Sequence, residues 1–122
     1  MSLINIPKYY ENEPGIIKKS GELIKEFGKK AFIIGSKTAL RVALTDLSES
    51  LSENGIRYAV RTFEGYPSRT WIEHYSKEIE GKGYDIIIGI GGGKVMDLTK
   101  AIGFLNNLNV ITVPPPIPII IS

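Results

Sequence analysis

The sequence predicts an α/β fold of three layers, in which a Rossmann-like parallel sheet lies between helices that cover both of its faces. Three observations predict it. Short apolar segments rich in β-branched residues recur along the 122-residue chain, as is typical of buried parallel strands. Segments with helical periodicity separate them, and turn-forming residues stand at the junctions. This alternation indicates βαβ units with right-handed crossovers.

The individual elements follow from local patterns. Residues 4–7 are a short apolar start closed by proline, consistent with an edge strand. Gly28 and the pair Asn54-Gly55 are typical helix ends, and Ser68 is a typical N-cap. The other expected strands cover residues 31–34, which we predict to be an inner parallel strand, 56–63, 85–90 and 110–113. The expected helices cover about 16–27, 37–53, 69–80 and 94–106.

Three consecutive glycines separate the third of these strands from the helix that follows it. Glycine leaves the backbone N–H groups uncovered and adopts angles closed to other residues. The amino end of a helix adds unpaired N–H donors and a positive dipole end, so a phosphate or pyrophosphate group is the expected ligand. The alternative is a glycine turn that only lets strand and helix pack. The candidate cofactor-binding residues here are Gly91, Gly92, Gly93, Lys94 and Val95.

This stretch is neither the usual dinucleotide fingerprint nor a P-loop, which would need glycine at Lys94 and at Ile88 respectively. Instead, Gly91-Gly92-Gly93-Lys94-x-x-Asp97-x-x-Lys100-Ala101 resembles the signature of glycerol dehydrogenase and its relatives. Their superfamily comprises iron- or zinc-dependent polyol and alcohol dehydrogenases, glycerol-1-phosphate dehydrogenase and dehydroquinate synthase. The resemblance implies a dehydroquinate synthase-like N-terminal domain that binds NAD or NADP.

The resemblance also implies a catalytic position for Asp97, near the nicotinamide or the reacting end of the substrate. Spacing alone leaves a second interpretation open, because Lys94 and Lys100 each lie three residues from Asp97 and could pair with it on the helix. In the family, an aspartate and two histidines of a helical domain hold zinc or iron, which is expected only in the full-length member. With one histidine and no cysteine, we predict no metal site in this chain.

Ser36 and Lys37 follow the first inner strand, near the expected position of the adenosine ribose. The family commonly has aspartate at the place of Ser36, where a carboxylate binds ribose hydroxyls. Because serine carries no charge to repel a 2′-phosphate and Lys37 lies beside it, we expect NADP to be tolerated. The alternative is that Ser36 only caps the second helix.

Composition excludes several classes of protein. The formal charge of +2 is too small to indicate nucleic-acid binding. No proline-free apolar run of about 20 residues predicts a membrane span, and no segment has the pattern of a signal peptide. We therefore expect a cytoplasmic protein that could form a homo-oligomer.

The chain divides into an expected NAD(P)-binding domain over residues 1–113 and an atypical tail, rich in proline and isoleucine, over residues 114–122. The pair Val113-Pro114 matches the family, and the residues after it do not. The tail is therefore the end of a fragment, a segment of uncertain identity, or a genuine proline-rich extension.

These observations predict the cofactor-binding domain of a glycerol dehydrogenase-like oxidoreductase. The parent protein would transfer a hydride between NAD(P) and a polyol, an alcohol or glycerol phosphate. The segment alone is expected to be inactive. Two alternatives remain open, namely a lyase of the dehydroquinate synthase type and a non-catalytic nucleotide-binding module.

Overall fold

A computed structural model describes residues 3–5 and 16–113 of the chain, and the expected tail lies outside these residues. Five parallel strands form one sheet in the order β1-β5-β4-β2-β3. The strands are β1 (Leu3–Asn5), β2 (Lys30–Gly35), β3 (Arg57–Thr62), β4 (Ile86–Ile90) and β5 (Asn109–Val113). The helices are α1 (Ile16–Ile24), α2 (Lys37–Glu53), α3 (Arg69–Ile79) and α4 (Gly93–Leu105).

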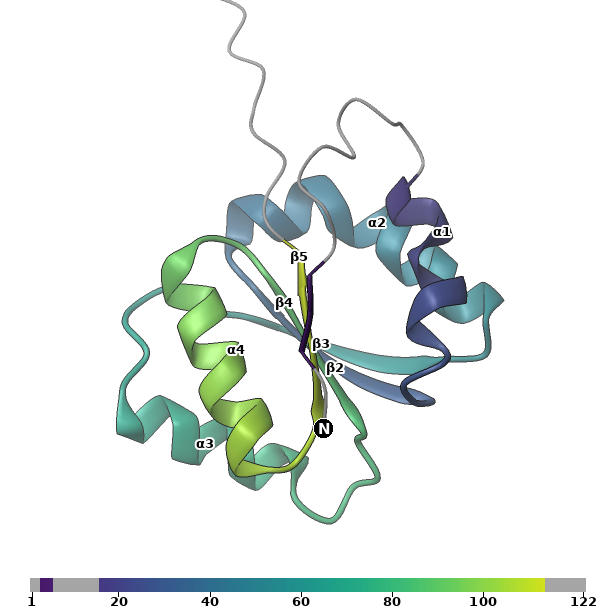
Figure 1. The fold of residues 1–122 in the computed structure, drawn as a ribbon. Coiled ribbons are helices and arrows are strands. Elements are labelled where there is room, and N and C mark those ends of the chain that lie inside the picture. The colour runs from purple at the N-terminus through teal and green to yellow at the C-terminus, as the bar shows by residue number, and fades with distance from the viewer. Residues whose placement is uncertain (1–2, 6–15, 114–122) are drawn as a thin grey trace, which may run out of the picture.

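The helices cover both faces of the sheet, which confirms the predicted α/β class. α1 and α2 lie on one face, and α3 and α4 lie on the other (Figure 1). The short β1 pairs with β5, as expected for an edge strand. Among the described residues, no helix is long and apolar enough to cross a membrane.

Most element bounds differ from the expected ones by one to three residues. β3 is shorter by one residue at each end than the predicted strand over 56–63. α1 ends at Ile24 rather than near Phe27. The Phe27 N–H bonds to the carbonyl oxygen of Ile24 at 2.8 Å, and the Glu26 N–H bonds to that of Leu23 at 3.3 Å. These three-residue spacings form turns instead of a further α-helical turn.

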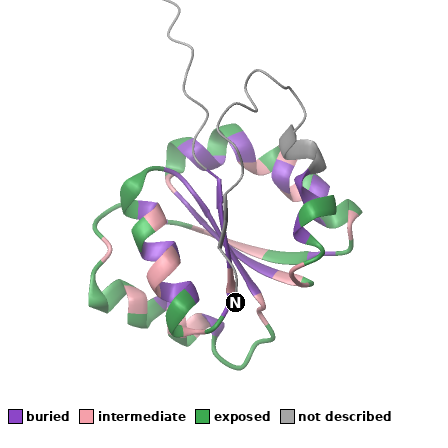
Figure 2. Ribbon diagram, viewed as in Figure 1, coloured by how far each residue is buried: buried purple, intermediate pink, exposed green. Residues whose placement is uncertain are grey.

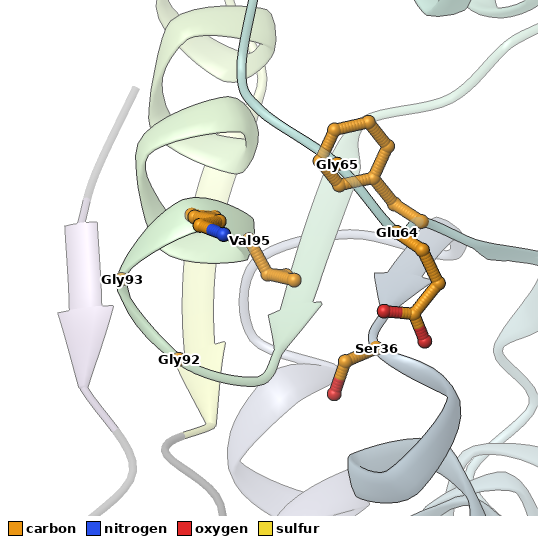
Figure 3. Close-up of a pocket in the computed structure, with 8 residues that line it drawn as sticks. Ser36, Glu64, Gly65, Gly92, Gly93 and Val95 are labelled. Carbon is orange, nitrogen blue, oxygen red and sulfur yellow. The ribbon is translucent and has the colours of Figure 1, made fainter.

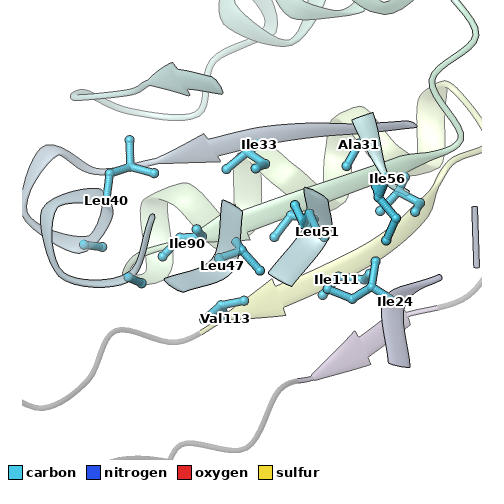
Figure 4. Close-up of a cluster of buried hydrophobic side chains, with 14 residues drawn as sticks. Ile24, Ala31, Ile33, Leu40, Leu47, Leu51, Ile56, Ile90, Ile111 and Val113 are labelled. Atoms are coloured by element: carbon cyan, nitrogen blue, oxygen red, sulfur yellow. The ribbon is translucent and has the colours of Figure 1, made fainter. Parts of the chain in front are cut away.

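Alternate side chains of β2, β4 and β5 enter two separate cores, and these three strands are almost entirely buried, whereas the edge strand β3 is not (Figure 2). Ile33 and Ile88 pack under α1 and α2 together with Leu47 and Leu51 (Figure 4). Phe32 and Ile87 face the opposite way and contact α3 and α4. A sheet covered on both faces explains why its strands read as continuous apolar runs.

α4 packs so closely on the sheet that two contact positions, Gly89 and Gly103, have no room for a side chain. A Cβ atom at Gly89 of β4 would lie 2.3 Å from the Thr99 hydroxyl oxygen. A Cβ atom at Gly103 of α4 would lie 2.2 Å from a methyl carbon of Val110 in β5. These two glycines leave room for the Thr99 and Val110 side chains, which pack directly against the glycine backbone between α4 and the sheet.

We predict that Gly89→Ala lowers the free energy of unfolding by about 1–3 kcal/mol, because the added methyl group overpacks this contact. Urea denaturation of the wild-type and variant chains measures the change. Thr99→Ala removes the hydroxyl and one methyl group, so the double variant should be more stable than the sum of the single effects predicts. If the stability changes of the two single variants simply add in the double variant, Thr99 is not the group that clashes with the methyl group at position 89.

Tyr75 of α3 is buried among Phe32, Phe63 and Trp71. Burial of its phenol raises the pKa of Tyr75 above the ordinary value of 10.0, the nearby Glu78 carboxylate raises it further, and the Arg61 guanidinium lowers it in part. The folded state therefore holds the Tyr75 proton at a pH where the unfolded chain releases it.

Stability should consequently fall as the pH rises through the unfolded pKa of about 10 and should level off only above the folded pKa. At neutral pH the phenol is protonated in both states, so it contributes no pH dependence there. Denaturation of wild type and Tyr75→Phe at about pH 8 and about pH 10.5 separates this effect from other titrations. An equal loss of stability in both chains would contradict the assignment to Tyr75.

Candidate active site

The carboxyl ends of β2, β3, β4 and β5 lie along one rim of the parallel sheet. The Ser36 N–H after β2 bonds to the Ile90 carbonyl oxygen of β4 at 3.1 Å. The Gly91 N–H after β4 bonds to the Val113 carbonyl oxygen of β5 at 3.3 Å. The loops that follow β2 and β4 then lead into helices on opposite faces of the sheet. This is the switch point at which open α/β sheets bind ligands.

A cavity of about 330 Å³ opens at this switch point, a size typical of small-molecule sites. Figure 3 shows Ser36 from the segment after β2, Glu64 from the segment after β3 and Val95 from the first turn of α4 around it. The lining residues are Ser36, Phe63, Glu64, Gly65, Gly92, Gly93, Lys94 and Val95. The buried Phe63 and Val95 supply apolar surface, and the exposed Glu64 and Lys94 carry opposite charges.

The three consecutive glycines differ in what the fold requires of them. Gly91 has φ +150°, and a Cβ atom there would lie 3.0 Å from a methyl carbon of Val95, so the backbone itself demands glycine. Gly92 has an ordinary extended conformation with φ −80°. A Cβ atom at Gly92 or Gly93 would meet nothing within 4 Å. The packing of the described chain therefore gives no reason for glycine at these two positions, which line the cavity.

The amino end of α4 presents open N–H donors to the cavity. Its N-cap is Gly92, which provides no side-chain hydrogen bond, and its first turn contains no acidic residue. The Lys94 ammonium lies 4.0 Å from the centre of the exposed Tyr66 ring. This cation–π contact keeps a positive charge at the mouth. Donors, dipole and ammonium together favour an anionic ligand.

At the amino end of α2, by contrast, side chains accept hydrogen bonds from the backbone N–H groups. The Ser36 hydroxyl oxygen accepts from the Ala39 N–H at 3.3 Å, which confirms the N-cap interpretation of Ser36. The Glu64 carboxylate accepts from the Lys37 N–H at 2.9 Å. Lys37 thus meets the site through its backbone, and it is not among the residues that line the cavity.

Asp97 is exposed on α4 and is also not among the lining residues. Of the described ion pairs, none joins it to Lys94 or Lys100, so the structure does not support the pairing that the spacing allowed. Lys94 contacts the Tyr66 ring instead.

The described part of the chain contains no group of three or more His, Cys, Asp or Glu side chains that could hold a metal ion. The lone histidine, His74, contacts Trp71 and Tyr75 and lies 3.9 Å from a Glu78 carboxylate oxygen on the surface of α3. These residues therefore do not fit the metal that the family resemblance implies, and no chemical step is assigned to it here.

The predicted cofactor-binding residues do not include Phe63, Glu64 and Gly65, although the predicted parallel sheet already places Glu64 and Gly65, after a strand, at the ligand-binding rim. All three lie at the carboxyl end of β3, a strand whose position beside β2 brings them to the same rim as the glycines. An acidic residue directly after a predicted strand was the available signal for Glu64.

Comparison with known proteins agrees with this geometry. The model of the family described as iron-containing alcohol dehydrogenase matches residues 7–121. A glycerol dehydrogenase of Pseudomonas putida is 27% identical over 91% of this chain and 30% of its own length. A sulfoacetaldehyde reductase of Bilophila wadsworthia is 36% identical over 75% of this chain and 24% of its own.

Solved structures show the same fold. The crystal structure of glycerol dehydrogenase from Schizosaccharomyces pombe superposes with a TM-score of 0.75 at 24% identity, over 93% of this chain and 27% of that one. An iron-containing alcohol dehydrogenase gives a TM-score of 0.72 at 23% identity, over 93% and 36%. The chain spans about a third or less of the relatives it matches. It belongs to the iron-containing alcohol dehydrogenase family.

Proposed function

We propose that this chain binds a nicotinamide dinucleotide, with the pyrophosphate at the amino end of α4. The observation that carries the proposal is the pair Gly92 and Gly93, which line the cavity although nothing in the surrounding packing requires glycine there. A ligand that must approach the backbone closely explains both residues.

Each part of the site has a defined task in this proposal. The N–H groups at the beginning of α4 donate to the phosphate oxygens, as at other helix amino ends. The Lys94 ammonium, which contacts the Tyr66 ring in the structure, pairs with the negatively charged phosphates of the ligand. Phe63 and Val95 give the dinucleotide an apolar wall. Gly91 sets the turn that directs these donors into the cavity.

The parent reaction proposed is hydride transfer between a small alcohol or polyol and the nicotinamide. The bound dinucleotide would supply the redox chemistry. The names of the relatives, glycerol dehydrogenase and sulfoacetaldehyde reductase, support a reaction that interconverts a hydroxyl and a carbonyl group. Within this proposal Asp97 keeps the role near the reacting end that the family motif implies. Glycerol-dependent reduction of NAD(P) by the whole protein that contains this chain is the matching activity measurement.

The first test distinguishes the effect of Gly93 on stability from its effect on ligand binding. Gly93→Ala should raise the free energy of unfolding by about 0.5–1 kcal/mol, because alanine favours the helix and restricts the unfolded chain. The same change should weaken ADP-ribose binding at least tenfold, since the methyl group occupies the path of the phosphates. Urea denaturation and calorimetric titration measure the two effects.

Gly91→Ala is the matched control, because its positive φ should make that variant lose stability. Undiminished ADP-ribose binding by a folded Gly93→Ala chain would overturn the proposed position of the pyrophosphate.

The second test concerns charge. Lys94→Gln should weaken ADP-ribose binding about tenfold and should reduce the dependence of the affinity on salt concentration, because one cation–phosphate contact is lost. Lys100→Gln, on the same helix but outside the cavity lining, should leave both quantities close to wild type. Equal effects of the two changes would indicate a general electrostatic attraction rather than a site at Lys94.

A further inference from the structure

The Glu64 carboxylate enters the cavity from the end of β3, opposite the glycines. Glu64 is exposed, lines the cavity, and points toward Ser36 at the beginning of α2 (Figure 3). One carboxylate oxygen, Oε1, accepts from the Lys37 N–H at 2.9 Å. Within the described residues the other oxygen, Oε2, has no hydrogen-bond partner, so it remains an acceptor for a ligand.

Two helix amino ends therefore meet at this cavity with opposite character. α4 has no side-chain cap, and Lys94 follows its N-cap closely. At α2, the N–H groups of Lys37 and Ala39 are already satisfied by Glu64 and Ser36. A full negative charge stands where a second anion would otherwise bind. The cavity thus accepts phosphate on the α4 side and hydroxyl donors on the α2 side.

The charge of Glu64 is not cancelled by a neighbouring cation. None of the ion pairs found in the described part of the chain includes Glu64. Lys37 contacts the carboxylate through its backbone only. A phosphate beside Glu64 would therefore meet an unpaired carboxylate, and like charges at close range disfavour binding.

We propose that Glu64 selects the dinucleotide, accepting a hydrogen bond from a ribose hydroxyl and excluding a ribose that carries a 2′-phosphate. The inference rests on the proposed function and adds that the chain prefers NAD to NADP. It replaces the expectation drawn from Ser36 alone, because the negative charge that Ser36 lacks comes from the neighbouring strand. Removal of the Glu64 charge should therefore open the site to a 2′-phosphate.

The experiment compares two probes that differ only in the phosphate, ADP-ribose and 2′-phospho-ADP-ribose, by calorimetric titration of the full chain. Wild type should bind ADP-ribose at least tenfold more tightly. In Glu64→Gln, whose amide oxygen can still accept from the Lys37 N–H, this ratio should fall at least fivefold, chiefly through tighter binding of the phosphorylated probe. Glu49→Gln, the same change of charge on the exposed side of α2, is the control and should keep the wild-type ratio.

The wild-type measurement tests the proposal even if Glu64→Gln folds poorly, because the preference should also weaken with added salt. Equal binding of the two probes by wild type, or an unchanged ratio in a folded Glu64→Gln chain, would overturn the role of Glu64 and leave dinucleotide binding intact. A similar shift in Glu49→Gln would also overturn it. Failure of wild type to bind either probe would instead reject the proposed function itself.

Discussion

The close contact between α4 and the sheet is the constraint on which the rest of the site depends. Gly89 and Gly103 bring the helix against β4 and β5 at distances that a Cβ atom would forbid. Contacts at the middle of the helix, through Thr99, and near its carboxyl end, through Gly103, fix its axis, so its amino end is held at the rim where β4 ends. Helix donors and the dipole act within roughly the first turn only, so a small displacement of α4 would remove them from the cavity.

The second property of the site is the difference between its two helix amino ends. α2 and α4 follow neighbouring strands, and both begin beside the same cavity. One is satisfied by Ser36 and Glu64, and the other is left open. The resulting polarity comes from capping and strand order rather than from net charge, which is only +2 for the whole chain.

Much of this arrangement could be predicted from the sequence because it is local. Apolar runs and helical periods identified the elements, and the predicted parallel sheet then placed Gly92, Gly93 and Lys94 at the rim, where they line the cavity. The N-cap role of Ser36 spans only three residues. Such features need no knowledge of distant contacts.

The features that sequence reasoning missed depend on contacts between distant segments. The bond between Lys37 and Glu64 joins residues 27 apart, and it exists only because β3 lies beside β2. The packing requirement at Gly89 likewise depends on where Thr99 of α4 comes to lie. The early end of α1 has a local cause instead, the three-residue hydrogen bonds of Glu26 and Phe27. Lys94 contacts the distant Tyr66 ring rather than Asp97.

Four glycines of α4 and its neighbouring segments differ in what constrains them. Gly89 and Gly103 are held by architecture, so any descendant that keeps the fold must keep them small. No such packing constrains Gly92 and Gly93, so under the proposed function a lineage that no longer binds the ligand could acquire side chains there and gain rigidity. Substitutions confined to Gly92 and Gly93 would identify relatives that keep the fold but no longer bind the proposed ligand.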